Sequence, residues 1–125
     1  MNVLIADDSP TIRALLRVFL MELRPNFFEA TDGGRALQLI RLTPIDLVIA
    51  DVRMSPMDGI TFVRDLRRDE RPRICSVPVV MLTGERSEEV RKQGIEAGAN
   101  AFVLKPVDPK VLLETITRIL PGPTQ

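Results

Sequence analysis

Four short apolar runs in this sequence each end at side chains that can take part in chemistry: Asp7 and Asp8, Asp51, Thr83, and Lys105. The carboxyl ends of neighbouring parallel strands meet at one edge of a sheet, so such strands would gather these side chains at one place. Three carboxylates would then lie together, and two unit charges about 4 Å apart repel by roughly 4 kcal/mol at an effective dielectric constant near 20. A hard divalent cation would offset this repulsion. Carboxylate oxygens suit Mg²⁺ (or Mn²⁺), so the sequence predicts a metal centre with Lys105 as an additional positive charge.

The same positions exclude other uses of a sheet edge. A loop that binds phosphate through free backbone amides is rich in Gly, Ser or Thr, whereas here Asp7 and Asp8 follow the first apolar run and would repel a phosphate. Neither the dinucleotide-binding glycine motif nor the P-loop motif occurs. What remains is a metal-assisted site in which an aspartate carboxylate is itself the nucleophile toward phosphorus.

Composition limits the remaining classes of function. The 125 residues are 45% apolar, which is typical of one folded domain, and 17 basic residues balance 17 acidic ones. No net charge draws the chain to nucleic acid, and the absence of Trp and Tyr leaves little for base stacking. With no His and the single Cys75, zinc sites and His-based triads are excluded. We therefore expect no binding of nucleic acid by this domain.

Membrane insertion and secretion are also not expected. No uncharged run approaches the roughly 20 residues that a membrane span needs. The first residues lack a basic region followed by an apolar stretch, so no secretion signal is indicated. The expected location is the cytoplasm.

Apolar runs and amphipathic segments alternate along the whole chain. Strands are expected at about 2–7, 26–31, 45–51, 77–82 and 101–105. Helices are expected from Pro10 to about Leu23, from about 34 to 42, from after Gly59 to about 69, from near Ser87 to about 98, and from about 108 to before 121. Asp58 and Asp108 are interpreted as helix caps. The charged second run is placed at a sheet edge.

Five such strand–helix units predict an α/β fold with a doubly wound, five-stranded parallel sheet, (βα)5, between two layers of helices. The runs at 47–50 and 79–82 are apolar throughout, as expected of strands buried on both faces. One domain is expected over residues 1–121. Residues 122–125, whose sequence begins with Gly-Pro, are interpreted as a tail or the start of a linker.

The complete pattern resembles the receiver domain of two-component response regulators, and the resemblance covers essentially the whole chain. It rests on Asp7-Asp8, on Asp51 followed by Met54 and Met57-Asp58-Gly59, on Thr83-Gly84, and on Lys105-Pro106. The resemblance implies the flavodoxin-like three-layer sandwich with strand order 2-1-3-4-5. It also implies a regulatory module that catalyses only its own phosphoryl transfer and slow autodephosphorylation, without being an enzyme that acts on other substrates.

By this resemblance, Asp51 is the phosphoacceptor and takes the phosphoryl group from a phosphohistidine. Asp7, Asp8 and Asp51 would hold Mg²⁺ together with the backbone carbonyl of Arg53. Lys105 would pair first with Asp51 and then with a phosphoryl oxygen, so that metal and ammonium neutralise the transferred group.

The resemblance further implies a conformational switch. The Thr83 hydroxyl would move onto a phosphoryl oxygen, and Phe102 would rotate inward to fill the space that it leaves; Phe102 as plain core is the alternative. The peptide bond between Lys105 and Pro106 would be cis. Many receivers have proline four residues after the phosphoacceptor, where this chain has Ser55.

Two residues at the mouth of the site, Arg53 and Glu85, lie two positions after Asp51 and two positions after Thr83, respectively. We hypothesise that they face each other across the phosphoryl group and screen it from water. The alternative is a solvated ion pair of little energetic value.

The partners that the resemblance implies are a sensor histidine kinase or a histidine phosphotransfer protein, and a downstream target or a second copy of the chain. The first helix has two apolar stripes, which indicates either a surface for the kinase or a deeply buried helix. The fourth predicted helix, the fifth strand and the last helix would form the phosphorylation-dependent face. A pseudo-receiver scaffold and a small phosphohydrolase with an aspartyl-phosphate intermediate are the competing interpretations.

Overall fold

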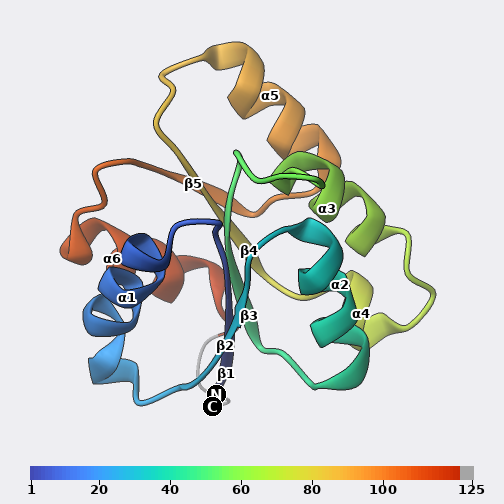
Figure 1. The fold of residues 1–125 in the computed structure, drawn as a ribbon, viewed down its shortest axis with the longest axis horizontal. Coiled ribbons are helices and arrows are strands. Elements are labelled where there is room, and N and C mark those ends of the chain that lie inside the picture. Colours follow the sequence, from blue (N-terminus) through green and yellow to red (C-terminus); the bar gives the residue numbers. More distant parts are fainter. Residues whose placement is uncertain (122–125) are drawn as a thin grey trace.

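The computed structural model describes residues 1–121, and the predicted tail or linker at 122–125 lies outside the described residues. The described chain forms one five-stranded parallel sheet in the order β2-β1-β3-β4-β5, which confirms the predicted α/β class and strand order (Figure 1). The strands are β1 (Asn2–Ala6), β2 (Asn26–Ala30), β3 (Leu47–Asp51), β4 (Val79–Thr83) and β5 (Ala101–Leu104).

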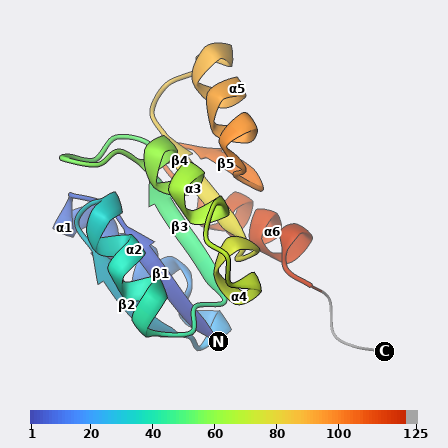
Figure 2. The same cartoon turned by 90° about the vertical axis from the view of Figure 1, so that its right-hand side faces the viewer.

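Helices cover both faces of this sheet. They are α1 (Pro10–Phe19), α2 (Gly33–Leu42), α3 (Gly59–Arg67), α4 (Pro72–Cys75), α5 (Glu88–Ala97) and α6 (Pro109–Ile119). α1 and α6 lie on one face, and α2, α3, α4 and α5 lie on the other, so the molecule has three layers (Figures 1 and 2). Within residues 1–121, none of these helices is long and apolar enough to cross a membrane.

Two hydrophobic cores result from the alternation of side chains along the strands. In β3, Leu47 and Ile49 pack with α1 and α6, whereas Val48 and Ala50 pack with α2 and α3. All five residues of β3 and of β4 are buried, as the apolar runs predict for central strands. β2 lies at the edge of the sheet and has two exposed residues, so its predicted edge position is confirmed.

Local capping explains where most helices begin. Ser9, Asp58, Ser87 and Asp108 each accept a hydrogen bond from a backbone N–H in the first turn of the helix that follows. Such a cap satisfies one of the amide groups that a helix start leaves free. The interpretation of Asp58 and Asp108 as caps is therefore confirmed.

Two predicted helix ends are wrong. The first helix was expected to reach Leu23, but α1 ends at Phe19 and a 3-10 turn follows at Met21–Leu23. Pro25 disfavours the helical conformation at the residue before it, and Arg24 instead adopts a left-handed φ of 50° that turns the chain toward β2. The third helix ends at Arg67 and not near residue 69.

The sequence also gave no indication of α4, because four residues are too short to show a helical period. Proline at its first position favours this single turn. The Arg67 side chain holds it from outside: Nη1 donates to the carbonyls of Cys75 and Val77 at 2.9 and 2.7 Å. Cys75 itself is only partly exposed and forms no disulfide.

Gly59 joins the end of β3 to α3 at a place that has no room for a side chain. Its N–H donates to the carbonyl of Val52 at 3.0 Å. A Cβ at this position would meet the backbone carbonyl of Asp51 and would lie 2.7 Å from Cε of Met81. The start of α3 can therefore lie this close to the end of β3 only because residue 59 is glycine.

Gly59→Ala is expected to lower the free energy of unfolding by about 1–3 kcal/mol, since overpacking must displace backbone. Gly84→Ala is the matched control, because within residues 1–121 nothing lies within 4 Å of a Cβ built there. The control should change stability by less than about 1 kcal/mol. Urea denaturation followed by far-ultraviolet circular dichroism measures both, and equal stability of the two variants would contradict the prediction.

Candidate metal and phosphoacceptor site

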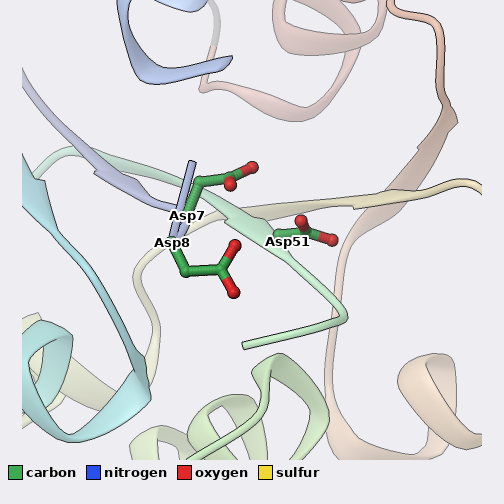
Figure 3. A group of neighbouring side chains, drawn as sticks. All are labelled: Asp7, Asp8 and Asp51. Carbon is green, nitrogen blue, oxygen red and sulfur yellow. The ribbon is translucent and has the colours of Figure 1, made fainter. Parts of the chain in front are cut away.

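Three carboxylates meet at the carboxyl end of the sheet. Asp7 and Asp8 follow β1, Asp51 ends β3, and these strands are neighbours with Ala6 opposite Ala50. One oxygen from each carboxylate lies within 4.8 Å of the other two (Figure 3). Asp7 and Asp51 are buried while Asp8 is exposed, so the cluster is open to solvent at Asp8.

Lys105 supplies the positive charge of this cluster. It follows β5, and its Nζ lies 2.6 Å from Oδ2 of Asp51 and 3.5 Å from Oδ2 of Asp7. Its backbone N–H donates to the carbonyl of Thr83 at 2.8 Å, which fixes the start of the loop. The peptide bonds before Pro56 and Pro106 are both cis. The structure thus brings together four of the five reactive side chains, the three aspartates and Lys105, from the ends of β1, β3 and β5.

Burial and charge shift the protonation equilibria of these groups. Burial raises the pKa of Asp7, and the nearby charge of Asp51 raises it further against the opposing hydrogen bond from the Ser9 N–H. Burial acts to lower the pKa of Lys105, but its hydrogen bond to Asp51 and the two aspartate charges outweigh this and raise it. The ammonium therefore stays protonated, while the surroundings of Asp7 disfavour its charged form.

Backbone amides orient the two buried carboxylates. Oδ1 of Asp7 accepts from the N–H of Ser9 at 2.9 Å, and Oδ1 of Asp51 accepts from the N–H of Arg53 at 3.1 Å. Among residues 1–121, no buried side-chain nitrogen or oxygen lacks a hydrogen-bond partner. A set of oxygen ligands with excess negative charge and one open side fits Mg²⁺, which keeps several of its waters when bound.

Thr83 and Phe102 occupy the neighbouring strands. The Thr83 side chain is buried at the end of β4, and its Oγ1 accepts from the N–H of Glu85 at 3.1 Å. Phe102 in β5 is half-buried, and its ring packs where α5 has a glycine: Cε1 and Cε2 lie 2.6 and 2.8 Å from the place of a Cβ at Gly94. Gly94 therefore forms the space that the Phe102 ring fills.

Arg53 and Glu85 form an ion pair at the mouth of the site. Nε of Arg53 lies 2.6 Å from Oε1 of Glu85, and Nη2 contacts the same oxygen. The backbone N–H of Arg53 donates to the Asp51 carboxylate, and the backbone N–H of Glu85 donates to the Thr83 hydroxyl. The ion pair therefore joins the two loops that flank the site. The Arg53 side chain is 72% exposed, so it borders solvent.

One contact was not predicted from the sequence. Nη1 of Arg13, in α1, donates to the backbone carbonyl of Asp7 at 2.7 Å. The available signal was the spacing of Arg13 and Arg17, one turn apart, together with the charge of Glu29 in the second strand. Every residue type has a backbone carbonyl, so the sequence does not indicate which carbonyl Arg13 contacts.

The chain matches the family model described as response regulator receiver domain over residues 3–117. It is 36% identical to the chemotaxis protein CheY of Pseudomonas aeruginosa, with 95% of each chain covered. It is 35% identical to the response regulator GtcR of Aneurinibacillus migulanus, of which it spans 46%, and 36% identical to the sensor protein EvgS of Escherichia coli, of which it spans 10%. The crystal structure of CheY4 of Vibrio cholerae is similar, with a TM-score of 0.86, 34% identity and 95% and 98% of the two chains covered.

Replacing Asp7 by Asn is expected to stabilise the metal-free protein. Because the pKa of Asp7 in the folded state lies above its ordinary value of 3.8, the folded state binds this proton more tightly than the unfolded state, and ionising Asp7 weakens folding as the pH rises above 3.8. In EDTA at pH 7, Asp7→Asn should therefore be more stable than the parent protein. This advantage should disappear as the pH falls toward 4.

Urea denaturation between pH 4 and pH 7 measures this effect. Asp8→Asn is the control, since the exposed Asp8 carries no comparable burial penalty and should give a smaller gain. A loss of stability in Asp7→Asn at pH 7, or a gain independent of pH, would show that Asp7 is not under electrostatic strain.

Proposed function

Because the chain belongs to the family of response regulator receiver domains, we propose that it is a phosphorylation-dependent switch of two-component signalling. Asp51 accepts the phosphoryl group, either from a sensor histidine kinase or from a histidine phosphotransfer protein. The observation that carries this proposal is the contact of Lys105 Nζ with Asp51 Oδ2 at 2.6 Å, within a cluster of three carboxylates. Such a cluster is unfavourable unless a cation offsets the repulsion among its charges.

In the proposed reaction, the Asp51 carboxylate attacks the phosphorus of a phosphohistidine. The new bond joins oxygen to phosphorus, the phosphorus–nitrogen bond breaks, and its electron pair returns to the imidazole nitrogen. Asp7, Asp8, Asp51 and the Arg53 carbonyl would hold Mg²⁺, which would supply positive charge against the phosphoryl oxygens. The Lys105 ammonium, which already faces Asp51, neutralises a further oxygen and keeps its proton because its pKa is raised.

The switch requires groups that contact the phosphoryl group better in one conformation than in another. We assign this role to the Thr83 hydroxyl, whose present partner is the Glu85 N–H, and to Phe102 beside it. Both residues line a cavity of about 470 Å³, which also extends over residues of α5, the end of β5 and the start of α6. Movement of Thr83 would therefore reshape this surface, which we call the α5–β5–α6 face.

The partners in this proposal use two surfaces. Leu15 and Val18 of α1 and Met21 of the 3-10 turn after it are 44%, 61% and 65% exposed, so an apolar stripe along this stretch is not buried by the fold. We assign this stripe to the histidine-bearing partner. The α5–β5–α6 face, where Leu104 and Val111 are exposed, is assigned to a downstream protein or to a second copy. We expect the cytoplasm as the location, where a lone thiol such as Cys75 stays reduced.

Incubation with Mg²⁺ and acetyl phosphate is expected to add one phosphoryl group, measured as a gain in intact mass. Asp51→Asn should abolish the gain, because the amide is a far weaker nucleophile. EDTA should also abolish it if the carboxylate cluster holds the required cation. Rapid turnover of several phosphoesters would instead indicate a phosphohydrolase, and no reaction in the parent protein would indicate a scaffold.

Arg53→Ala is expected to accelerate the loss of the phosphoryl group by up to about fivefold, the factor that corresponds to an exposed pair worth about 1 kcal/mol. The reason is that the ion pair with Glu85 restricts the approach of water to Asp51. Arg86→Ala, an exposed arginine next to Glu85, is the control and should leave the rate unchanged. The rates are measured by mass spectrometry as the decay of the phosphorylated protein at constant Mg²⁺. Equal rates for the parent protein and both variants would show that the ion pair does not protect the phosphoryl group.

A further inference from the structure

The two arginines of α1 pair with the same carboxylate but differ in burial and in their other contacts. Nε of Arg13 lies 2.9 Å from Oε1 of Glu29, and Nη1 of Arg17 lies 3.0 Å from Oε2 of the same residue. Within residues 1–121, only the guanidinium of Arg13 has a further partner, the backbone carbonyl of Asp7 at 2.7 Å. The Arg13 side chain is 16% exposed, compared with 48% for Arg17. Arg13 is therefore enclosed between the edge strand and the loop that follows β1.

The contact of Arg13 fixes a peptide bond that matters for the carboxylate cluster. The carbonyl that it binds belongs to the peptide that joins Asp7 to Asp8. The remaining polar atoms of Asp7 are also held: its N–H donates to Ala30, and its Oδ1 accepts from Ser9. The exposed Asp8 contributes the N–H of this same peptide, so a change in the peptide plane would move the start of Asp8. A short hydrogen bond from a charged donor is a strong way to hold it, since such bonds are roughly twice as strong as neutral ones.

We propose that Arg13 is a positioning residue of the metal site: it holds the peptide between Asp7 and Asp8, and Glu29 fixes its guanidinium in place. This inference rests on the proposed function, because it takes these aspartates to bind Mg²⁺. Groups that orient metal ligands without touching the metal typically change metal affinity by about 10–100-fold when they are removed. The planar guanidinium is suited to this task because it can donate to a carboxylate and to a carbonyl from one rigid group.

The sign of the effect separates positioning from simple electrostatics. Removal of a positive charge near a cation site strengthens cation binding if charge alone matters. Removal of a positioning group weakens binding. Arg13→Ala is therefore expected to raise the dissociation constant for Mg²⁺ about tenfold. Arg17→Ala removes an equal charge from the same carboxylate but leaves the Asp7 contact, so its constant should stay within about twofold of the parent value or fall.

Isothermal titration calorimetry with MgCl₂ measures these constants, and circular dichroism in EDTA shows that each variant is folded. Arg13→Lys is the second variant, which keeps the charge and can still pair with Glu29 but lacks the rigid fork. It should also bind Mg²⁺ more weakly than the parent protein, whereas an electrostatic role predicts no change. This variant decides the question if Arg13→Ala does not fold.

The inference is overturned if Arg13→Ala binds Mg²⁺ as tightly as the parent protein or more tightly, or if Arg17→Ala weakens binding equally. Those outcomes leave the proposed function intact, because the parent protein still binds the cation. Absence of Mg²⁺ binding by the parent protein overturns both the inference and the proposed function.

Discussion

The repulsion among three carboxylates at the end of a buried parallel sheet is the interaction on which the rest of the site depends. Each close pair of such charges costs several kcal/mol at a moderate dielectric constant, and a whole domain is stable by only about 5–15 kcal/mol. The sheet can hold Asp7 and Asp51 together because their strands are anchored by side chains with no exposed area, such as Ile5 and Ile49. Lys105 relieves part of the repulsion from the far side of β4. In the proposed function, this residual negative charge is what would draw a cation to the site.

The same constraint links the site to distant surfaces through short backbone contacts. The Lys105 side chain contacts Asp51 while its backbone N–H donates to the carbonyl of Thr83, so this residue links the site to the ends of β4 and β5. Glu85, which binds the Thr83 hydroxyl through its backbone, leads into α5. Phe102 packs against that helix at Gly94. These contacts connect Asp51 to α5 through neighbouring elements at one edge of the sheet, which is the arrangement that the proposed switch needs.

Much of this structure could be predicted from the sequence, because the strongest signals are also the most local ones. Uniform apolar runs identify β3 and β4, capping side chains identify the starts of helices, and the reactive residues follow strands whose ends must meet. The order of the strands came from the resemblance to receiver domains and not from the apolar pattern, since each run fits several positions in a sheet. The helix ends at Phe19 and Arg67 could not be read, because tertiary packing and the turn at Arg24 decide them. The four-residue α4 is shorter than any periodic signal.

The contacts that sequence reasoning could not supply are those in which a side chain binds backbone. The Arg67 side chain donates to backbone carbonyls at the end of α4, and the Arg13 side chain donates to the carbonyl of Asp7. Every residue type has such a carbonyl, so the acceptor cannot be identified from residue type. The side chain–side chain pair of Arg53 and Glu85, by contrast, was accessible from residue type and spacing. Arginine serves both purposes because one planar group donates in several fixed directions. A chain with fourteen arginines and three lysines can therefore bind loops to one another at many points, while the compact ammonium of Lys105 is placed where a single point charge must face a carboxylate.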